Sequence, residues 1–286
     1  MYPILKTHPI ILPKEQYVDR FGSAAALVDT NPSMHINSDG SFTILVRRVN
    51  YRKFADRQFT LGSYPSESKY VVATGNIRDL SRLDVVPLKI DYGIPTYRAL
   101  WRGPEDIRFV TATYVIATIP ECNPTGTPTI FQGCLDVDTL RYVEPCFPNS
   151  GSEKNWMPYE DFLYSQRVIY SLSPFRVKHV KTGDLETMPI DLPELVGYHG
   201  STNGIKYGGD NLLFLVHVNR ERTYHRWLLF HPRNKTAQVS TEFVFFQYSY
   251  IEFPVSLCAY DEKLYVSIGV NDETAFILEV LSPSFG

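Results

Sequence analysis

The feature that most constrains this fold is a regular recurrence of short strand-like clusters with no helical periodicity between them. Each cluster opens with a polar phrase: Asn31-Pro32-Ser33, Gly103-Pro104-Glu105-Asp106, Glu153-Lys154-Asn155-Trp156, Gly200-Ser201-Thr202 and Ile251-Glu252-Phe253. After a longer first step, these phrases begin about 50 residues apart, which suits one four-stranded propeller blade each. We therefore expect an all-β, five-bladed β-propeller that forms a single domain over residues 1–286, with an insertion between Lys53 and Asp91.

The segments inside each cluster have the composition of strands. Ile107 to Ile116, Leu212 to Val218 and Lys263 to Ile268 are rich in β-branched, aromatic and aliphatic residues. Turn residues separate such segments, and the 20 prolines of the chain disfavour long helices. Because the innermost strands of a propeller converge on a central channel, the polar phrases are expected to meet at one axial site.

Charge and cysteine content exclude several classes of protein. With 28 basic and 31 acidic residues, the chain lacks the broad positive field that nucleic-acid binding needs. No apolar run approaches the ~20 residues that span a bilayer, and the first residues do not resemble a secretory signal. The four cysteines, Cys122, Cys134, Cys146 and Cys258, lack zinc-ligand spacing. We expect a cytoplasmic protein with free thiols, no nucleic-acid or membrane partner, no metal and no cofactor.

The most informative phrase is Glu105-Asp106-Ile107-Arg108, which places two carboxylates and a guanidinium where a strand begins. Glycosyl transfer needs a carboxyl group that gives or takes a proton at the glycosidic oxygen. Asp106 is our candidate for this general acid or base, and Glu105 and Arg108 are expected to tune and orient it. The alternative interpretation is a structural ion pair in which Arg108 fixes a turn.

The phrase Glu153-Lys154-Asn155-Trp156 has the composition of a sugar or phosphate pocket. Such pockets combine an apolar ring face with directional hydrogen bonds. Glu153 is a second candidate catalytic residue, Lys154 and Asn155 are candidates to bind hydroxyls or phosphate, and Trp156 is a candidate stacking face. The alternative is a solvated turn with Trp156 in the core.

Other polar residues complete the candidate substrate-binding set. They are Asn31, Arg48 and Asn50 in the first unit, Thr202, His217, Tyr224 and His225 in the fourth, and Asp272 in the fifth. Tyr224 offers a second stacking face, and His225 could hydrogen-bond a hydroxyl or phosphate. The two histidines have no third ligand at a telling spacing, so a metal site is not expected. The alternative is a turn for Asn31, the end of an edge strand for Arg48 and Asn50, and a hairpin turn for Asp272. For a histidine it is a satisfied core or hairpin residue.

Taken together, the phrases resemble the five-bladed β-propeller superfamily of glycoside-active enzymes. The nearest branch is that of the β-1,2-mannoside phosphorylases and related mannosyltransferases, whose catalytic aspartate lies in an Asp-Pro-Arg phrase. The matching position here reads Asp106-Ile107-Arg108, so isoleucine replaces the proline. The resemblance extends from about Asn31 to Ile277 and implies a catalytic role for Asp106.

One departure from this resemblance bears on the reaction. Hydrolases of the arabinanase and xylosidase branch have an aspartate base in the first blade, where this chain offers Asn31, Arg48 and Asn50. The missing base disfavours hydrolysis and favours a reactant that brings its own charge. Phosphate, a sugar phosphate or a nucleotide sugar would do so, held by the cationic candidates Lys154, Arg48, Arg108, His225 and Arg226.

The sequence thus predicts a glycosyltransferase or glycoside phosphorylase acting on a sugar or oligosaccharide acceptor. One alternative is a glycoside hydrolase in which Glu153 and either Asp106 or Asp272 form a carboxylate pair, about 6.5–9.5 Å apart for an inverting enzyme. The other is a non-catalytic sugar-binding propeller. The propeller arrangement further predicts that Asp106, Glu153, Thr202 and Asp272 face one pocket.

Overall fold

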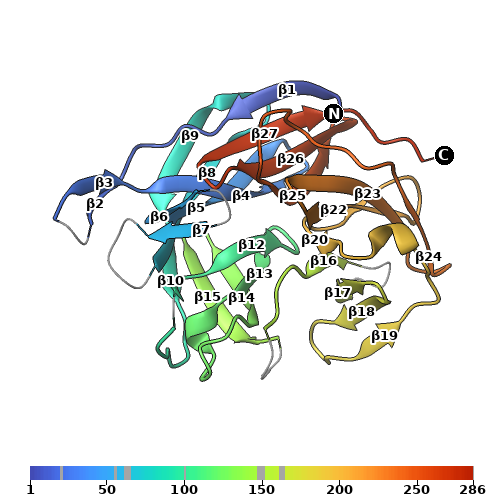
Figure 1. Ribbon diagram of the computed structural model, residues 1–286, viewed down its shortest axis with the longest axis horizontal. Coiled ribbons are helices and arrows are strands. Elements are labelled where there is room, and N and C mark those ends of the chain that lie inside the picture. Colours follow the sequence, from blue (N-terminus) through green and yellow to red (C-terminus); the bar gives the residue numbers. More distant parts are fainter. Residues whose placement is uncertain are drawn as a thin grey trace.

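The computed structural model describes residues 1–19, 22–54, 57–60, 66–99, 101–146, 152–160 and 165–285. Within these residues the chain forms strands and two short 3₁₀ helices, η1 (Pro120–Cys122) and η2 (Pro193–Leu195), and no α-helix. Five main sheets are arranged radially around a common axis (Figure 1). The expected all-β, five-bladed β-propeller is therefore confirmed.

The first two blades each carry an additional parallel strand. Blade one contains β4 (Val28–Ile36), β5 (Ser41–Val49), β8 (Ser66–Asn76) and β9 (Asp79–Pro87), with β11 (Trp101–Arg102) parallel to β8. Blade two contains β12 (Glu105–Phe109), β13 (Tyr114–Thr118), β14 (Ile130–Asp136) and β15 (Thr139–Pro145), with β10 (Lys89–Asp91) parallel to β15. Both additional strands come from the connection between the two blades.

The remaining blades are built from antiparallel hairpins. Blade three contains β16 (Met157–Glu160), β17 (Gln166–Leu172), β18 (Phe175–His179) and β19 (Leu185–Thr187). Blade four contains β20 (His199–Gly200), β21 (Ile205–Lys206), β22 (Leu212–Asn219), β23 (Thr223–His231) and β24 (Thr236–Val239). Blade five contains β25 (Glu252–Tyr260), β26 (Lys263–Val270), β27 (Thr274–Val280) and β1 (Ile4–Pro9).

Two small hairpins lie outside the blades. They are β2 (Gln16–Val18) with β3 (Ala24–Ala26), and β6 (Tyr51–Phe54) with β7 (Arg57–Thr60). The expectation of an insertion between Lys53 and Asp91 was partly wrong, because β8 and β9 in this range are regular strands of blade one. The β6–β7 hairpin is the part that departs from the blade pattern. Positions 55, 56 and 61–65 of the expected insertion lie outside the described residues.

The ring is closed by strands from the two ends of the chain. The early strand β1 pairs antiparallel with β27, from Ile4 opposite Val280 to Pro9 opposite Phe276 (Figure 1). Blade five therefore takes its outermost strand from the N-terminal region and its other three from the C-terminal region. This pairing covers an edge that β27 would otherwise expose.

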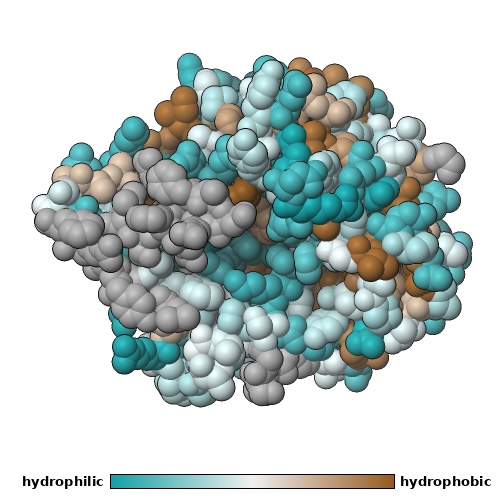
Figure 2. Space-filling view, viewed as in Figure 1, coloured by the Kyte–Doolittle hydropathy of each residue, from teal (hydrophilic) through white to brown (hydrophobic). Residues whose placement is uncertain are grey.

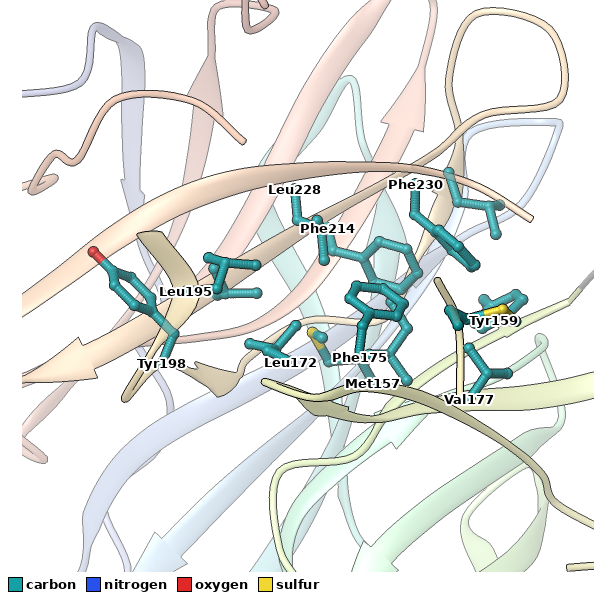
Figure 3. Close-up of a cluster of buried hydrophobic side chains, with 14 of the residues drawn as sticks. Met157, Tyr159, Leu172, Phe175, Val177, Leu195, Tyr198, Phe214, Leu228 and Phe230 are labelled. Atoms are coloured by element: carbon teal, nitrogen blue, oxygen red, sulfur yellow. The ribbon is translucent and has the colours of Figure 1, made fainter. Parts of the chain in front are cut away.

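The core is divided among the interfaces between neighbouring blades. The cluster between blades three and four contains Met157, Phe175, Phe214 and Phe230 (Figure 3), and each of the other four interfaces has its own cluster of buried side chains. Strand β22 shows how the sequence achieves this arrangement. Alternate residues of a strand point to opposite faces, so Phe214 enters the cluster shared with blade three, whereas Leu215 enters the one shared with blade five.

The first strands of the blades surround the axis, where β4 contacts both β12 and β25. Two of these strands contain an irregularity at a polar residue. The pairing register shifts around Asn31 in β4 and around Asp106 in β12, and these residues have φ values of 43° and 48°. Asparagine and aspartate tolerate this left-handed region better than most residues. Such bulges redirect side chains next to functional sites, and here they bring Asn31 and Asp106 together.

Candidate functional site

A pocket of about 330 Å³ lies at the axis, and its lining comes from all parts of the ring. The face viewed in Figure 2 is hollowed near its centre, where hydrophilic residues gather. We call this site the axial pocket. It is lined by Asn31, Arg47, Tyr51, Trp101, Glu105, Asp106, Lys154, Asn155, His217, Asn219, Thr223, Ile251, Glu252, Phe253 and Asp272.

Asp106 is a carboxylate of the axial pocket that two residues of blade one hold in place. Asn31 donates a hydrogen bond from Nδ2 to Oδ1 of Asp106 at 3.1 Å, and Arg47 Nη1 lies 3.7 Å from the same oxygen. Among the described residues, none donates a hydrogen bond to Oδ2 of Asp106. Burial would raise the pKa of Asp106, but Arg47, Arg108 and the Asn31 hydrogen bond together hold it below its usual range. Asp106 is therefore a carboxylate at neutral pH.

The neighbouring Glu105 is held between two cations. Its Oε1 accepts a hydrogen bond from Arg47 Nη2 at 2.5 Å, and its Oε2 accepts one from Lys154 Nζ at 3.1 Å. Arg47 also donates to the hydroxyls of Tyr51 at 2.9 Å and Ser68 at 2.8 Å. Because both oxygens of Glu105 are engaged, its principal effect is to fix the two cations beside Asp106.

Glu252 forms the wall of the axial pocket at the start of β25. Its side chain is 1% exposed and accepts hydrogen bonds from the backbone N–H groups of Phe245 and Phe246 at 2.8 and 2.9 Å. His225 Nε2 lies 3.0 Å from Oε2 of Glu252, and the hydroxyl of Ser249 bonds Oε1. Burial would raise the pKa of Glu252, but these partners hold it below its usual range. So many donors mark Glu252 as a structural carboxylate.

Two further polar residues complete the pocket chemistry. His217 is buried, and its Nδ1 lies 2.7 Å from the hydroxyl of Ser201. Burial, together with the neighbouring histidines and Arg108, holds the pKa of His217 well below its usual value, so the imidazole is neutral. Asp272 lies in the turn between β26 and β27, has a φ of 52° and is 8% exposed. It gives the axial pocket a second aspartate, from blade five.

The structure brings together about half of the candidate residues. Those that line the axial pocket are Asn31, Glu105, Asp106, Lys154, Asn155, His217 and Asp272. Those that lie outside its lining are Arg48, Asn50, Arg108, Glu153, Trp156, Thr202, Tyr224 and His225. Of the four residues expected to converge, Asp106 and Asp272 share the pocket, whereas Glu153 and Thr202 do not line it.

Glu153 and Trp156 lie behind the axial pocket, at the interface between blades two and three. Trp156 is 1% exposed and belongs to the hydrophobic cluster between these blades. Glu153 accepts hydrogen bonds from Trp156 Nε1 at 3.1 Å and from the hydroxyl of Tyr170 at 3.0 Å. The Trp156 ring is thus enclosed by core residues and offers no exposed face to a sugar. Lys154, between them in sequence, is 40% exposed and does line the pocket.

Strand alternation explains why Arg47 rather than Arg48 lines the axial pocket. Consecutive residues of β5 point to opposite faces. Arg48 donates from Nε to Asp29 Oδ1 at 2.7 Å and from Nη2 to the carbonyl of Pro13 at 2.7 Å. Asn50 accepts a hydrogen bond from the backbone N–H of Glu67 at 2.8 Å. Both Arg48 and Asn50 therefore hold neighbouring segments in place.

The remaining candidates outside the pocket are held by protein groups. Arg108 is 1% exposed and donates from Nε to the carbonyl of Ser201 at 2.5 Å, which ties blade two to blade four. Thr202 accepts a hydrogen bond from the backbone N–H of Leu215 at 3.0 Å. The hydroxyl of Tyr224 donates to Glu221. His225 is fully buried against Glu252, so it supports a pocket residue without lining the pocket itself.

Sequence reasoning missed the other residues of the lining, which are Arg47, Tyr51, Trp101, Asn219, Thr223, Ile251, Glu252 and Phe253. The sequence did contain a signal for three of these residues, because the phrase that opens the fifth unit is Ile251-Glu252-Phe253. Trp101 had no such signal, because it reaches the pocket only through the pairing of β11 with β8.

No group of three or more His, Cys, Asp or Glu side chains suited to a metal ion occurs in the described part of the chain. None of the four cysteines, all of which lie in the described part of the chain, forms a disulfide. Among the described residues, no helix is long and apolar enough to cross a membrane.

Several solved structures share this fold. A β-1,2-mannobiose phosphorylase from Listeria innocua, in complex with β-1,2-mannobiose, superposes with a TM-score of 0.64 at 14% identity, covering 90% of this chain and 90% of its own. A glycosyl hydrolase from Bacteroides ovatus has a TM-score of 0.63 at 12% identity, covering 99% and 95%. A GDP-Man-dependent mannosyltransferase from Leishmania mexicana has a TM-score of 0.59 at 9% identity, covering 90% and 86%.

These likenesses confirm the resemblance in fold over nearly the whole chain, and at such low identity they show the fold alone. No protein-family model matches the sequence, and no curated protein matches it.

Proposed function

We propose that this chain is a carbohydrate-active enzyme that transfers a glycosyl group within the axial pocket, with Asp106 as its general base. Three solved structures of the same fold are named as a mannobiose phosphorylase, a glycosyl hydrolase and a mannosyltransferase. Each name describes chemistry at a glycosidic bond. Because a shared fold does not fix function, the proposal depends on the residues of the pocket.

The observation that carries the proposal is the ionisation and the hydrogen bonding of the Asp106 carboxylate. It is ionised, fixed through Oδ1 by Asn31 and Arg47, and receives no hydrogen bond at Oδ2 from any described residue. Transfer of a glycosyl group to a hydroxyl requires removal of the hydroxyl proton. A carboxylate with one engaged and one available oxygen can accept that proton. A general acid would instead need a raised pKa.

The remainder of the lining has the chemistry of a sugar site. Tyr51, Trp101 and Phe253 contribute aromatic rings, and Asn155 and Asn219 contribute amides. Sugar-sized pockets commonly combine apolar ring faces with a few directional polar groups. These side chains support a sugar or oligosaccharide as the acceptor.

Lys154 is the best-placed cation for an anionic donor or for phosphate. Its side chain is 40% exposed, bonds Glu105 at 3.1 Å and lies 5.0 Å from the centroid of the Trp101 ring. A flexible ammonium group of this kind can turn toward a phosphate oxygen. Arg48 and Arg108, which we also considered for this role, are engaged outside the pocket. A sugar phosphate or nucleotide sugar as donor therefore depends mainly on Lys154, with Arg47 nearby.

A glycoside hydrolase is the second candidate, because Asp106 and Asp272 both line the axial pocket. Two carboxylates on opposite sides of a glycosidic bond can act as acid and base toward water. In this reaction Asp272, and not Glu153 as we first expected, would form the carboxylate pair with Asp106. Release of free sugar without any acceptor would distinguish hydrolysis from transfer.

The test is an NMR screen of the protein with sugar 1-phosphates and nucleotide sugars, with and without simple sugar acceptors. With an active donor, Asp106→Asn should lower turnover by roughly 10²–10⁴, the usual contribution of general acid–base catalysis. Binding should change little, because the amide can still hydrogen-bond a hydroxyl. The change at Glu153, Glu153→Gln, is the matched control and should retain most of the turnover.

Two outcomes would contradict the proposal. A folded Asp106→Asn protein with full turnover would remove Asp106 from the chemistry. Binding of sugars without turnover of any donor or glycoside would instead favour a non-catalytic sugar-binding propeller. The melting temperature of each variant separates loss of chemistry from loss of folding.

A further inference from the structure

A second and larger pocket, of about 720 Å³, lies between blades one and two. We call it the interblade pocket. Its walls come from β8, from the connection that leads into β12 and from η1, and they include Tyr92, Tyr97, Arg98, Arg102 and Glu121. It shares no lining residue with the axial pocket.

The interblade pocket contains two arginines whose charges are not used by the fold. Within the described residues, neither the Arg98 nor the Arg102 guanidinium makes a hydrogen bond or an ion pair. The axial arginine Arg47, in contrast, is surrounded by acceptors. A single exposed arginine needs no partner, but two on one concave surface raise the local positive potential. The planar guanidinium group also matches phosphate and carboxylate oxygens in pairs.

The carboxylates of the same pocket contact groups other than these two arginines. Glu121 is 4% exposed and accepts hydrogen bonds from the hydroxyl of Tyr92 at 2.6 Å and from the backbone N–H of Gly103 at 2.8 Å. Glu67 lies 4.0 Å from the ammonium group of Lys69. Neither carboxylate pairs with Arg98 or Arg102. Glu121 instead builds a buried, hydrogen-bonded floor beneath them.

The volume and the aromatic lining of the interblade pocket suit a sugar. Its volume lies within the usual range for small-molecule sites. Tyr97 is 41% exposed, and Tyr92 is half-buried. These rings supply apolar faces with a polar tip. A neutral sugar would leave the arginines without an acceptor, whereas a bare ion would leave most of the volume unfilled.

We propose that the interblade pocket binds a sugar that bears an oxyanion, with Arg98 and Arg102 at the anionic group. Residues adjacent in the sequence connect the interblade pocket to the axial pocket. Arg102 belongs to the two-residue strand β11, whose other residue, Trp101, lines the axial pocket. Gly103 is hydrogen-bonded to the floor and precedes Glu105 by two residues.

The test is titration of the ¹⁵N-labelled protein with mannose 1-phosphate, glucuronic acid, inorganic phosphate and uncharged mannose. The expected result is a shift of the Gly103 amide with one of the two charged sugars and a much weaker response to mannose. Tighter binding of mannose 1-phosphate assigns the site to phosphorylated sugars, and tighter binding of glucuronic acid assigns it to uronic acids. Either result supports the proposal.

Substitution of the arginines locates the site. Arg98→Ala and Arg102→Ala should each weaken binding by roughly tenfold or more, as expected for lost hydrogen bonds to a charged group. Arg82→Ala is the matched control, because Arg82 is 90% exposed and lies on β9 outside the interblade pocket. Both target side chains are exposed, so their removal should leave the melting temperature nearly unchanged.

Three outcomes would overturn the proposal. The first is the absence of any response to both charged sugars. The second is binding of mannose as tight as that of the charged sugars. The third is binding that survives both arginine substitutions but is lost in Lys154→Ala, which would assign the ligand to the axial pocket. None of these outcomes depends on turnover, so failure here leaves the role of Asp106 untouched.

Discussion

At the scale of single residues, the axial pocket gives different environments to two adjacent carboxylates. Glu105 uses both oxygens in contacts with Arg47 and Lys154. Asp106 is held at one oxygen by Asn31, and its pKa stays low despite burial because Arg47 and Arg108 lie nearby. A carboxylate that remains charged in a partly buried site can accept a proton, and the surrounding groups keep it in one orientation.

The lowered pKa of Asp106 predicts how activity and stability depend on pH. In the folded protein the carboxylate form is favoured relative to an unfolded chain, whose aspartate pKa is about 3.9. Asp106 therefore contributes stability above that value, and the contribution is lost as the pH falls through the lower folded pKa. The acidic limb of kcat/KM should likewise lie below about pH 4. Initial rates and melting temperatures measured together check this, and an acidic limb centred above pH 5 in a folded protein would contradict it.

At the scale of elements, the sequence allowed the strand clusters and their order to be predicted, but not which side of each strand meets the axis. Arg47 and Arg48 show the difficulty. A shift of one residue exchanges the two faces of a strand, and the register of β5 depends on its pairing with β4 and β8. That pairing contains a bulge beside Asn31, which no local pattern in the sequence announces.

Glu153 and Trp156 of the third polar phrase lie outside the axial pocket for a related reason. Strand β16 begins at Met157, so Glu153 and Trp156 belong to the segment that enters blade three. The same composition that suits a sugar site also suits a closed hydrogen bond between Trp156 and Glu153 at a blade interface. Only the packing of Trp156 against blade two distinguishes the two, and such packing depends on contacts distant in sequence.

The first strand of blade five offers a prediction about support of the axial pocket. Glu252 receives hydrogen bonds from Phe245, Phe246, Ser249 and His225. Glu252→Gln replaces one acceptor oxygen by a donor, so buried donors lose their partner. This should lower the free energy of unfolding by about 1–3 kcal/mol, measured by urea denaturation.

The control for this change is Glu186→Gln. Glu186 is 42% exposed, and it bonds Lys235 at 2.7 Å. Exposed pairs contribute little, so the loss should stay within about 1 kcal/mol. Equal effects of the two substitutions would show that the Glu252 cluster does not stabilise the blade.

At the scale of the whole molecule, stability is shared among five interfaces that all depend on ring closure. Each blade packs both faces against its neighbours, as Phe214 and Leu215 do on either side of β22. Each fully buried side chain of this size contributes roughly 1.5–3 kcal/mol. Separation of blades one and five would expose the cluster that contains Met34 and Ile277. The axial pocket would open with it, because Asn31 and Asp272 come from these two blades.

This arrangement predicts that strand β1 can be removed and supplied again. Deletion of residues 1–9 leaves the β27 edge without the partner that it has from Ile4 to Pro9, so the melting temperature should fall and association between chains should increase. A synthetic peptide of residues 1–9 should restore both, because its backbone can re-pair with β27. A peptide of the same composition in scrambled order is the control. Differential scanning fluorimetry and size-exclusion chromatography report the two effects. An unchanged melting temperature after deletion would show that the ring does not depend on this pairing. Equal rescue by the scrambled peptide would show that stability is not restored through pairing in register with β27.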